Sequence, residues 1–225
     1  MKSIHVLVII SVLALSACAT TERSQVEPFT VDLRSPQLPI GEIEWQVNRF
    51  MGMGGLRKNT VVVSYFPRED AVSIQYRAEF ITYHQFWSRD GRQAFIKALA
   101  QYNEDFEARN LQENNARRTR RAYGVVKGYL IWQLHAITVR ARGNMNVELG
   151  YEFRGRTPYF TINQREALYV DPLTVDSNRT SPVMTMYFTR AQAEVLAGLF
   201  DQEFLQGLVE TDTSFRVGSS DIDVY

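Results

Sequence analysis

The sequence predicts an α+β fold in which an antiparallel sheet of about six to seven strands packs against two main amphipathic helices. Several β-rich stretches follow one another with only turns between them, which favours antiparallel pairing. Two other stretches carry their apolar residues on one helical face, and such helices need a sheet face to cover. An apolar content of 45% is ordinary for a globular domain, so one substantial core is expected.

The first part of the domain is predicted to contain a hairpin. Residues 41–50 fit either a short helix or a strand, and the glycine-rich residues 51–55 are a predicted turn. Residues 60–66 are β-branched and aromatic, while residues 71–82 alternate apolar and polar side chains. Both patterns indicate strands, and the proline-containing turn between them makes a hairpin.

A helix is predicted after this hairpin, with Ser88 or Asp90 as its N-cap. Its apolar residues recur at spacings of four, three and four, as a single helical stripe requires. They are Phe95, Leu99, Tyr102 and Phe106. The polar residues that follow are predicted to extend this helix past Leu111, and Gly124 ends any continuation.

The second half of the chain is the more strand-like. Residues 123–142 are apolar on both faces, which predicts one central strand or two strands bent at Gly128. Gly143 and Asn144 are a predicted turn, and residues 145–154 alternate as a strand with one wet face. Shorter strands are predicted at residues 159–162, 167–170 and 182–188.

The second helix begins at a capping-box pattern formed by Thr189 and Gln192. Its apolar face consists of Leu196, Leu199, Phe200, Phe204 and Leu208. Gly207 loosens its end, and residues 211–225 form a polar C-terminal tail. The single α+β domain is therefore expected to cover residues 41–210.

The first 18 residues indicate where the protein resides. Lys2, an apolar run over residues 6–15 and small residues after it have the layout of a secretory signal. The run is shorter than the roughly 20 apolar residues that a membrane-spanning helix needs. The tetrapeptide 15–18, Leu-Ser-Ala-Cys, resembles the lipobox read by the lipoprotein-specific signal peptidase.

This resemblance to bacterial lipoprotein precursors covers residues 1–18 only. It implies that residues 1–17 are a signal peptide, that Cys18 carries a diacylglycerol thioether, and that the new amino terminus is acylated, for example with palmitate. The alternative is an ordinary secreted protein with a chance cysteine at its cleavage site. Cys18 is the only cysteine in the chain, so lipidation would also remove a leftover reactive thiol.

The resemblance also implies a location in the bacterial cell envelope. Residues 18–40 are polar and contain three prolines, so they are predicted to be the lipidated cysteine and a flexible tether. In enterobacterial lipoproteins an aspartate after the cysteine marks retention at the inner membrane. Ala19 stands there in this chain, which favours the outer membrane over the inner membrane.

The mature chain shows no motif for catalysis. Removal of Lys2 with the signal leaves 24 lysines and arginines against 25 aspartates and glutamates, so no overall charge favours a nucleic-acid partner. His84 and His135 are its only histidines, and neither has a second ligand at metal-binding spacing. No catalytic, cofactor-binding or metal-ligating residues are predicted, and no cofactor is expected.

One local concentration of charge is a candidate binding site. Four arginines fall within five residues: Arg117, Arg118, Arg120 and Arg121. They could bind lipid-headgroup phosphates or an acidic partner, each contributing on the order of 1 kcal/mol near an anionic surface. Alternatively, they are a solvated helix end whose charges complement the helix dipole.

These observations favour a lipid-anchored envelope protein with a non-catalytic binding or scaffolding domain. The first alternative is an envelope hydrolase whose carboxylates or His84 assemble in space, since such sites need not be visible in sequence. The second alternative is an accessory subunit of an envelope complex, which a large exposed apolar face would indicate.

Overall fold

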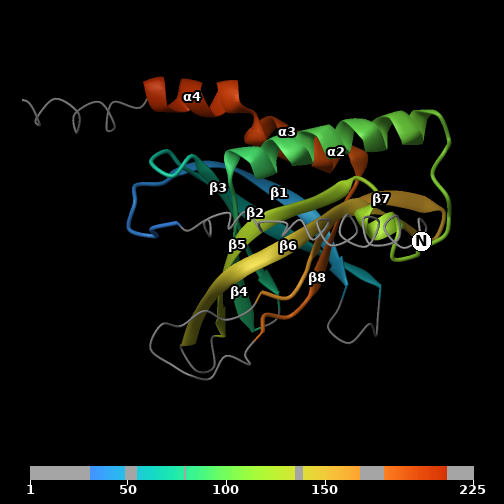
Figure 1. Ribbon diagram of the computed structural model, residues 1–225, viewed down its shortest axis with the longest axis horizontal. Helices are drawn as coiled ribbons and strands as arrows, with labels where there is room; N and C mark the ends of the chain where they lie inside the picture. Colours follow the sequence, from blue (N-terminus) through green and yellow to red (C-terminus); the bar gives the residue numbers. More distant parts are fainter. Residues whose placement is uncertain (1–30, 49–54, 79, 135–138, 168–179, 212–225) are drawn as a thin grey trace, which may run out of the picture.

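A computed structural model describes residues 31–48, 55–78, 80–134, 139–167 and 180–211. It is a closed barrel of eight antiparallel strands, in which each strand pairs with the next and β8 pairs with β1 (Figure 1). The strands are β1 (Leu38–Asn48), β2 (Leu56–Phe66), β3 (Ala71–Ala78), β4 (Ile81–Trp87), β5 (Gly124–Leu134), β6 (Val139–Arg154), β7 (Thr157–Gln164) and β8 (Met184–Phe188).

The predicted α+β architecture, with six to seven strands packed against two helices, was wrong. The sheet has eight strands and closes, because Gln46 of β1 lies opposite Tyr187 of β8. Alternation of apolar and polar residues indicates a half-buried strand equally well in an open sheet and in a barrel wall. Closure depends on pairing the first strand with the last, and no local pattern encodes it.

Two stretches that were each predicted as one strand contribute to two adjacent strands of the barrel. Residues 71–82 contribute to β3 and β4, and residues 123–142 contribute to β5 and the start of β6. The predicted turn at Gly143 and Asn144 lies inside β6 instead, where Asn144 pairs with Tyr129. The long cross-strand ladder between β5 and β6 overrides the local turn preference of these two residues.

The beginning of the described chain also differs from expectation. Residues 41–50 were compatible with a helix or a strand, and β1 is a strand that begins at Leu38. It therefore starts within the stretch predicted as a tether. Residues 31–37 of that stretch include Val31, which is buried against the barrel.

Aromatic side chains pack together with aliphatic ones inside the barrel. Trp45 packs edge-on against Tyr76 with ring centroids 5.1 Å apart, and Tyr76 stacks on Tyr83 at 5.0 Å. The buried hydroxyl of Tyr76 donates a 2.6 Å hydrogen bond to Oε1 of Gln164 on β7, across the barrel. An eight-stranded barrel is just wide enough for side chains to fill, and these rings fill it here.

The helices lie together at one end of the barrel (Figure 1). They are α2 (Arg89–Glu107), α3 (Arg190–Phe200) and α4 (Gln202–Thr211). Phe95 of α2 and Phe200 of α3 contact each other and Trp87 at the end of β4. This aromatic cluster continues the barrel core into the helical layer.

Both predicted helix starts are confirmed. Ser88 accepts a hydrogen bond from the Gly91 amide, and Thr189 forms a reciprocal capping box with Gln192. The predicted end of the first helix and the predicted continuity of the second were wrong. Helix α2 stops at Glu107, where Arg109 takes a positive φ of 57°, and the last helix divides at Asp201. Asp201 then caps α4 by accepting a 2.9 Å hydrogen bond from the Phe204 amide.

Alkaline pH is expected to destabilise the helical layer through Tyr102 of α2. Burial raises the pKa of Tyr102 to about 12 in the folded protein, whereas an unfolded tyrosine titrates near 10. The stabilisation is therefore complete below pH 10 and is lost as pH rises from 10 to 12. Urea unfolding at pH 8 and 11 should show a smaller loss in Tyr102→Phe than in the unsubstituted protein. Equal losses would contradict this assignment.

Several predictions fall outside the described residues. These are the signal peptide, Cys18, His135, the strand at 167–170 beyond Ala167, and the tail from residue 212 onward. Within the described part of the chain, no helix is both long enough and apolar enough to cross a membrane.

Candidate functional site

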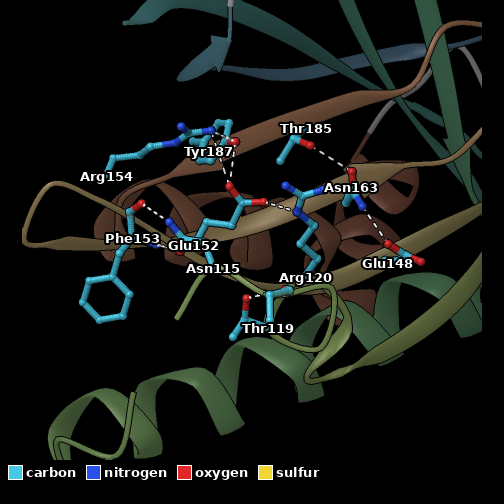
Figure 2. Close-up of polar contacts among 11 residues, drawn as sticks. Asn115, Thr119, Arg120, Glu148, Glu152, Phe153, Arg154, Asn163, Thr185 and Tyr187 are labelled. Atoms are coloured by element: carbon cyan, nitrogen blue, oxygen red, sulfur yellow. Dashed lines mark hydrogen bonds and ion pairs between the residues drawn. The ribbon is translucent and has the colours of Figure 1, made fainter. Parts of the chain in front are cut away.

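Buried polar side chains gather on the outer face of β6, β7 and β8 (Figure 2). Outward-facing residues of a barrel wall are ordinarily solvated, yet none of the five at the centre is more than 7% exposed. These five are Glu148, Glu152, Thr161, Asn163 and Tyr187. We call them, with Arg120, Arg154 and Thr185, the outer polar network.

Strand register brings the network together from distant parts of the sequence. Asn163 of β7 lies between Glu148 of β6 and Thr185 of β8. In the next outward-facing row, Thr161 lies opposite Tyr187. Because outward positions alternate along each strand, these side chains share one face of the wall.

Glu152 is the centre of the charged half of the network. Its Oε1 accepts a 2.5 Å bond from Nε of Arg120, and its Oε2 lies 3.4 Å from Nη2 of Arg154. The Tyr187 hydroxyl donates to Oε2 at 2.9 Å and accepts a hydrogen bond from Arg154. A buried carboxylate is strongly unfavourable unless it is paired and hydrogen-bonded, and Glu152 is both.

Tyr187 is kept protonated by this environment. Burial raises the pKa of Tyr187 above its ordinary value, against the opposing effect of the Arg154 guanidinium. The guanidinium carbon also lies 4.6 Å from the centroid of the Tyr187 ring. The tyrosine therefore acts as a neutral donor to Glu152 and as a surface on which Arg154 stacks.

The second half of the network is a chain of hydrogen bonds that runs from Thr185 through Asn163 to the carboxylate of Glu148. Thr185 donates to Oδ1 of Asn163 at 2.8 Å, and Nδ2 of Asn163 donates to Oε2 of Glu148 at 2.6 Å. The hydroxyl of Thr161 is buried between the two halves and makes no hydrogen bond among the described residues. The arrangement orders the wall through side-chain hydrogen bonds as well as through backbone pairing.

A short 3-10 helix, η2 (Thr119–Arg121), crosses the wall directly above Gly150. A Cβ atom at Gly150 would lie 2.0 Å from the carbonyl oxygen of Thr119, so only glycine permits this approach. Asn115, in the segment before η2, exchanges two hydrogen bonds with the backbone of Phe153 at 2.9 and 2.7 Å. The segment that carries the arginines is thereby fixed to the barrel.

The structure divides the four predicted arginines into two groups. Arg120 is half-buried, with 44% of its side chain exposed, because it pairs with Glu152. Arg117, Arg118 and Arg121 are exposed and make no ion pair among the described residues. We call these three the η2 arginine surface. The helix-end interpretation was wrong, since α2 ends at Glu107.

Of the two histidines of the mature chain, only His84 lies within the described residues. His84 lies on the outer face of β4, between Gln75 and Ile131 in the ladder, and its ring is stacked 6.4 Å from that of Phe86. His84 thus lies in the middle of β4. Across the described ranges, no group of three or more His, Cys, Asp or Glu side chains is placed to hold a metal.

Sequence reasoning missed the buried role of Glu148 and Glu152. Their period-two spacing assigned them to the solvated face of a strand, and they do lie on the outward face. The available signal was Gly150 between them, because a glycine inside a strand often marks a close backbone approach. The glycine alone does not show which segment of the chain lies against it.

Fold and site together define a closed eight-stranded antiparallel barrel with helices at one end and a polar network on its outer wall. A family model described as "Uncharacterised Treponema protein" matches residues 21–207. The chain belongs to this family, and Treponema are bacteria. No curated protein and no solved structure matches the chain.

Proposed function

We propose that this protein is a bacterial lipoprotein, held in the cell envelope by lipid on Cys18, at the outer rather than the inner membrane. Its barrel serves as a non-catalytic binding or scaffolding module for an anionic partner. One observation carries the binding role. The η2 arginine surface stands on a segment that is held to the barrel by the ion pair between half-buried Arg120 and buried Glu152 and by the close contact at Gly150.

Two observations support the anchor. The residues before Cys18 have the lipobox pattern, and the chain belongs to a family named for a bacterial genus. Each buried methylene of an acyl chain contributes about 0.8 kcal/mol, so two or three chains make attachment effectively permanent. The location at the outer membrane is favoured by Ala19, as argued from the sequence.

The chemistry of the η2 arginine surface supports an anionic partner. Guanidinium groups present several donors in a planar arrangement that matches carboxylate and phosphate oxygens. A segment already ordered by Asn115 and Arg120 loses little further conformational entropy on binding. Arg117, Arg118 and Arg121 are therefore available to an external anion, whereas Arg120 is engaged within the protein.

Charge reversal at all three positions tests the binding role. The acylated full-length protein, kept in mild detergent, is titrated with fluorescent poly-glutamate and with inorganic polyphosphate. Since each cation contributes on the order of 1 kcal/mol, the variant Arg117→Glu, Arg118→Glu, Arg121→Glu should bind at least about tenfold more weakly at low salt. The salt dependence of the remaining binding should also be shallower.

A matched control carries the same change of net charge elsewhere. Arg57 on β2 and Arg89 and Lys97 on α2 are exposed and lie outside the η2 segment, so replacing these three with glutamate should leave binding nearly unchanged. Equal weakening in both triple variants, or unchanged binding in the first, would contradict the proposal. The two probes distinguish a carboxylate partner from a phosphate partner.

An envelope hydrolase is the alternative proposal, together with an accessory subunit of an envelope complex. Glu148 and Glu152 are the two buried carboxylates on one wall. Four residues along a strand correspond to about 13 Å, which exceeds the separation of roughly 5–9.5 Å used by paired glycosidase carboxylates. Glu152 is also committed to its arginines, so a binding role accounts for this geometry better.

A further inference from the structure

The first described residues of the chain pack on the outer face of strands β2 to β5. Val31 is 8% exposed and belongs to a small apolar cluster on the outside of the barrel. The other buried members come from strands β2 to β5: Phe66, Ala71, Phe86, Tyr129 and Ile131. Ser35, further along the same segment, donates a hydrogen bond to Glu69. Residues 31–37 therefore lie against the outer face of the barrel near the turn between β2 and β3 (Figure 1, blue).

Val31 lies close in sequence to the proposed lipid attachment. Only residues 19–30 separate it from Cys18. Whatever their conformation, a connection of this length spans at most about 45 Å. If Cys18 carries the lipid, the wall that holds Val31 is the part of the barrel tied most closely to the bilayer.

The charges on this wall suit an anionic surface. The outward positions of β3, β4, β5 and the described first half of β6, up to Asn146, include no aspartate or glutamate. They include Arg77, Lys127 and Arg142, all of which are exposed, and the half-buried His84. The outer faces of β1 and of the rest of β6, in contrast, carry glutamates.

An exposed aromatic residue lies at the edge of the same wall. Phe80, in the turn between β3 and β4, is 69% exposed, the highest value among the exposed large hydrophobic side chains of the described chain. Arg77 and Thr82, which pair across β3 and β4, are its neighbours in this hairpin. An exposed aromatic side chain near a cation, here Arg77, is typical of surfaces that lie at the headgroup level of a bilayer.

We propose that the outer wall formed by β3, β4, β5 and the first half of β6 faces the membrane and contacts anionic lipid headgroups. We call it the basic wall. This inference rests on the proposed lipid anchor and specifies how the barrel is oriented on it. Helix η2 packs on β6 and β7 instead, so the η2 arginine surface lies on a different side of the barrel and stays accessible to a partner in the aqueous phase.

Site-specific lipid proximity tests the orientation. Acylated full-length protein is reconstituted in vesicles that contain phosphatidylglycerol and a headgroup-labelled nitroxide lipid. One variant carries Asn144→Cys on the basic wall, and its matched control carries Asn114→Cys before η2; both positions are exposed. Because Cys18 would be a thioether, the introduced thiol is the only one that a fluorophore can label.

The fluorophore at residue 144 should be quenched several-fold more strongly than the one at residue 114. The difference should shrink when Lys127→Glu and Arg142→Glu are added, or when the phosphatidylglycerol is replaced by a zwitterionic lipid. The matched pair Arg89→Glu and Lys97→Glu on α2, two exposed residues that belong to neither the basic wall nor the η2 arginine surface, should leave it unchanged. Electrostatic attraction by about 1 kcal/mol per cation accounts for the expected sensitivity to lipid charge.

Three outcomes would overturn the inference. Equal quenching at both positions, or stronger quenching at residue 114, in protein that floats with the vesicles overturns the basic wall and leaves the anchor intact. A difference that is insensitive to both lipid charge and charge reversal overturns the headgroup contact. Protein that does not float and is labelled at Cys18 overturns the anchor itself, and the orientation with it.

Discussion

Replacing Gly150 with alanine should lower the free energy of unfolding by about 3 kcal/mol or more, the upper range for overpacking a close contact. The new methyl group would lie 2.0 Å from the Thr119 carbonyl oxygen and 2.4 Å from the Arg120 carbonyl carbon. Both contacts are with backbone, so no side-chain rotation relieves them. The η2 segment must move off β6, which also separates Arg120 from Glu152.

The same substitution should weaken binding of poly-glutamate without any change of charge, because η2 carries the arginine surface. Urea unfolding and the binding titration are measured on the same protein. Gly198→Ala is the matched control. Nothing lies within 4 Å of a Cβ there, and alanine within α3 should raise stability by up to about 1 kcal/mol. If Gly150→Ala were as stable as Gly198→Ala, the close approach of η2 would be wrong.

Replacing Cys18 with serine should release the protein from the membrane fraction. A serine hydroxyl is not a substrate for thioether formation, so no diacylglycerol is attached, and the lipoprotein-specific cleavage that follows lipidation also fails. Loss of two or three acyl chains removes nearly all of the hydrophobic free energy of attachment. The measurement is the distribution of the protein between soluble and membrane fractions, together with incorporation of labelled palmitate.

The control for this experiment is Ala19→Asp, which leaves the cysteine in place. It should remain labelled by palmitate and remain in the membrane fraction. In a host that follows the enterobacterial sorting rule, it should move toward the inner membrane. Labelling of Cys18→Ser at the level of the unsubstituted protein would show that the lipid is attached elsewhere or that the lipobox resemblance is accidental.

Local features of the fold could be predicted from the sequence. The caps at Ser88 and Thr189 are confirmed because a cap depends on residues within one helical turn. The hairpin between residues 60–66 and the start of residues 71–82 is confirmed as the pairing of β2 with β3. Alternation in residues 71–82 placed Val72, Ile74 and Tyr76 correctly on the buried face. It was wrong for Ser73, which is buried although it was assigned to the polar face, and for Phe80, which is 69% exposed although it was assigned to the apolar face.

Features that depend on distant residues could not be predicted. Barrel closure requires Gln46 to meet Tyr187, and the alternation of each strand is compatible with many partners. Glu152 meets Arg120 only because η2 crosses the wall above Gly150. The arginine cluster was visible in the sequence, but its division into one half-buried and three exposed side chains follows from that crossing.

Lipid on Cys18 is the claim on which both the binding role in the envelope and the membrane-facing wall depend. The most direct test is mass spectrometry of the amino-terminal peptide of protein purified from its own bacterial host. The expected peptide begins at residue 18 and carries a diacylglycerol thioether and an acyl group on its amino nitrogen. A peptide that begins at Met1, or one with an unmodified thiol at Cys18, would contradict the account.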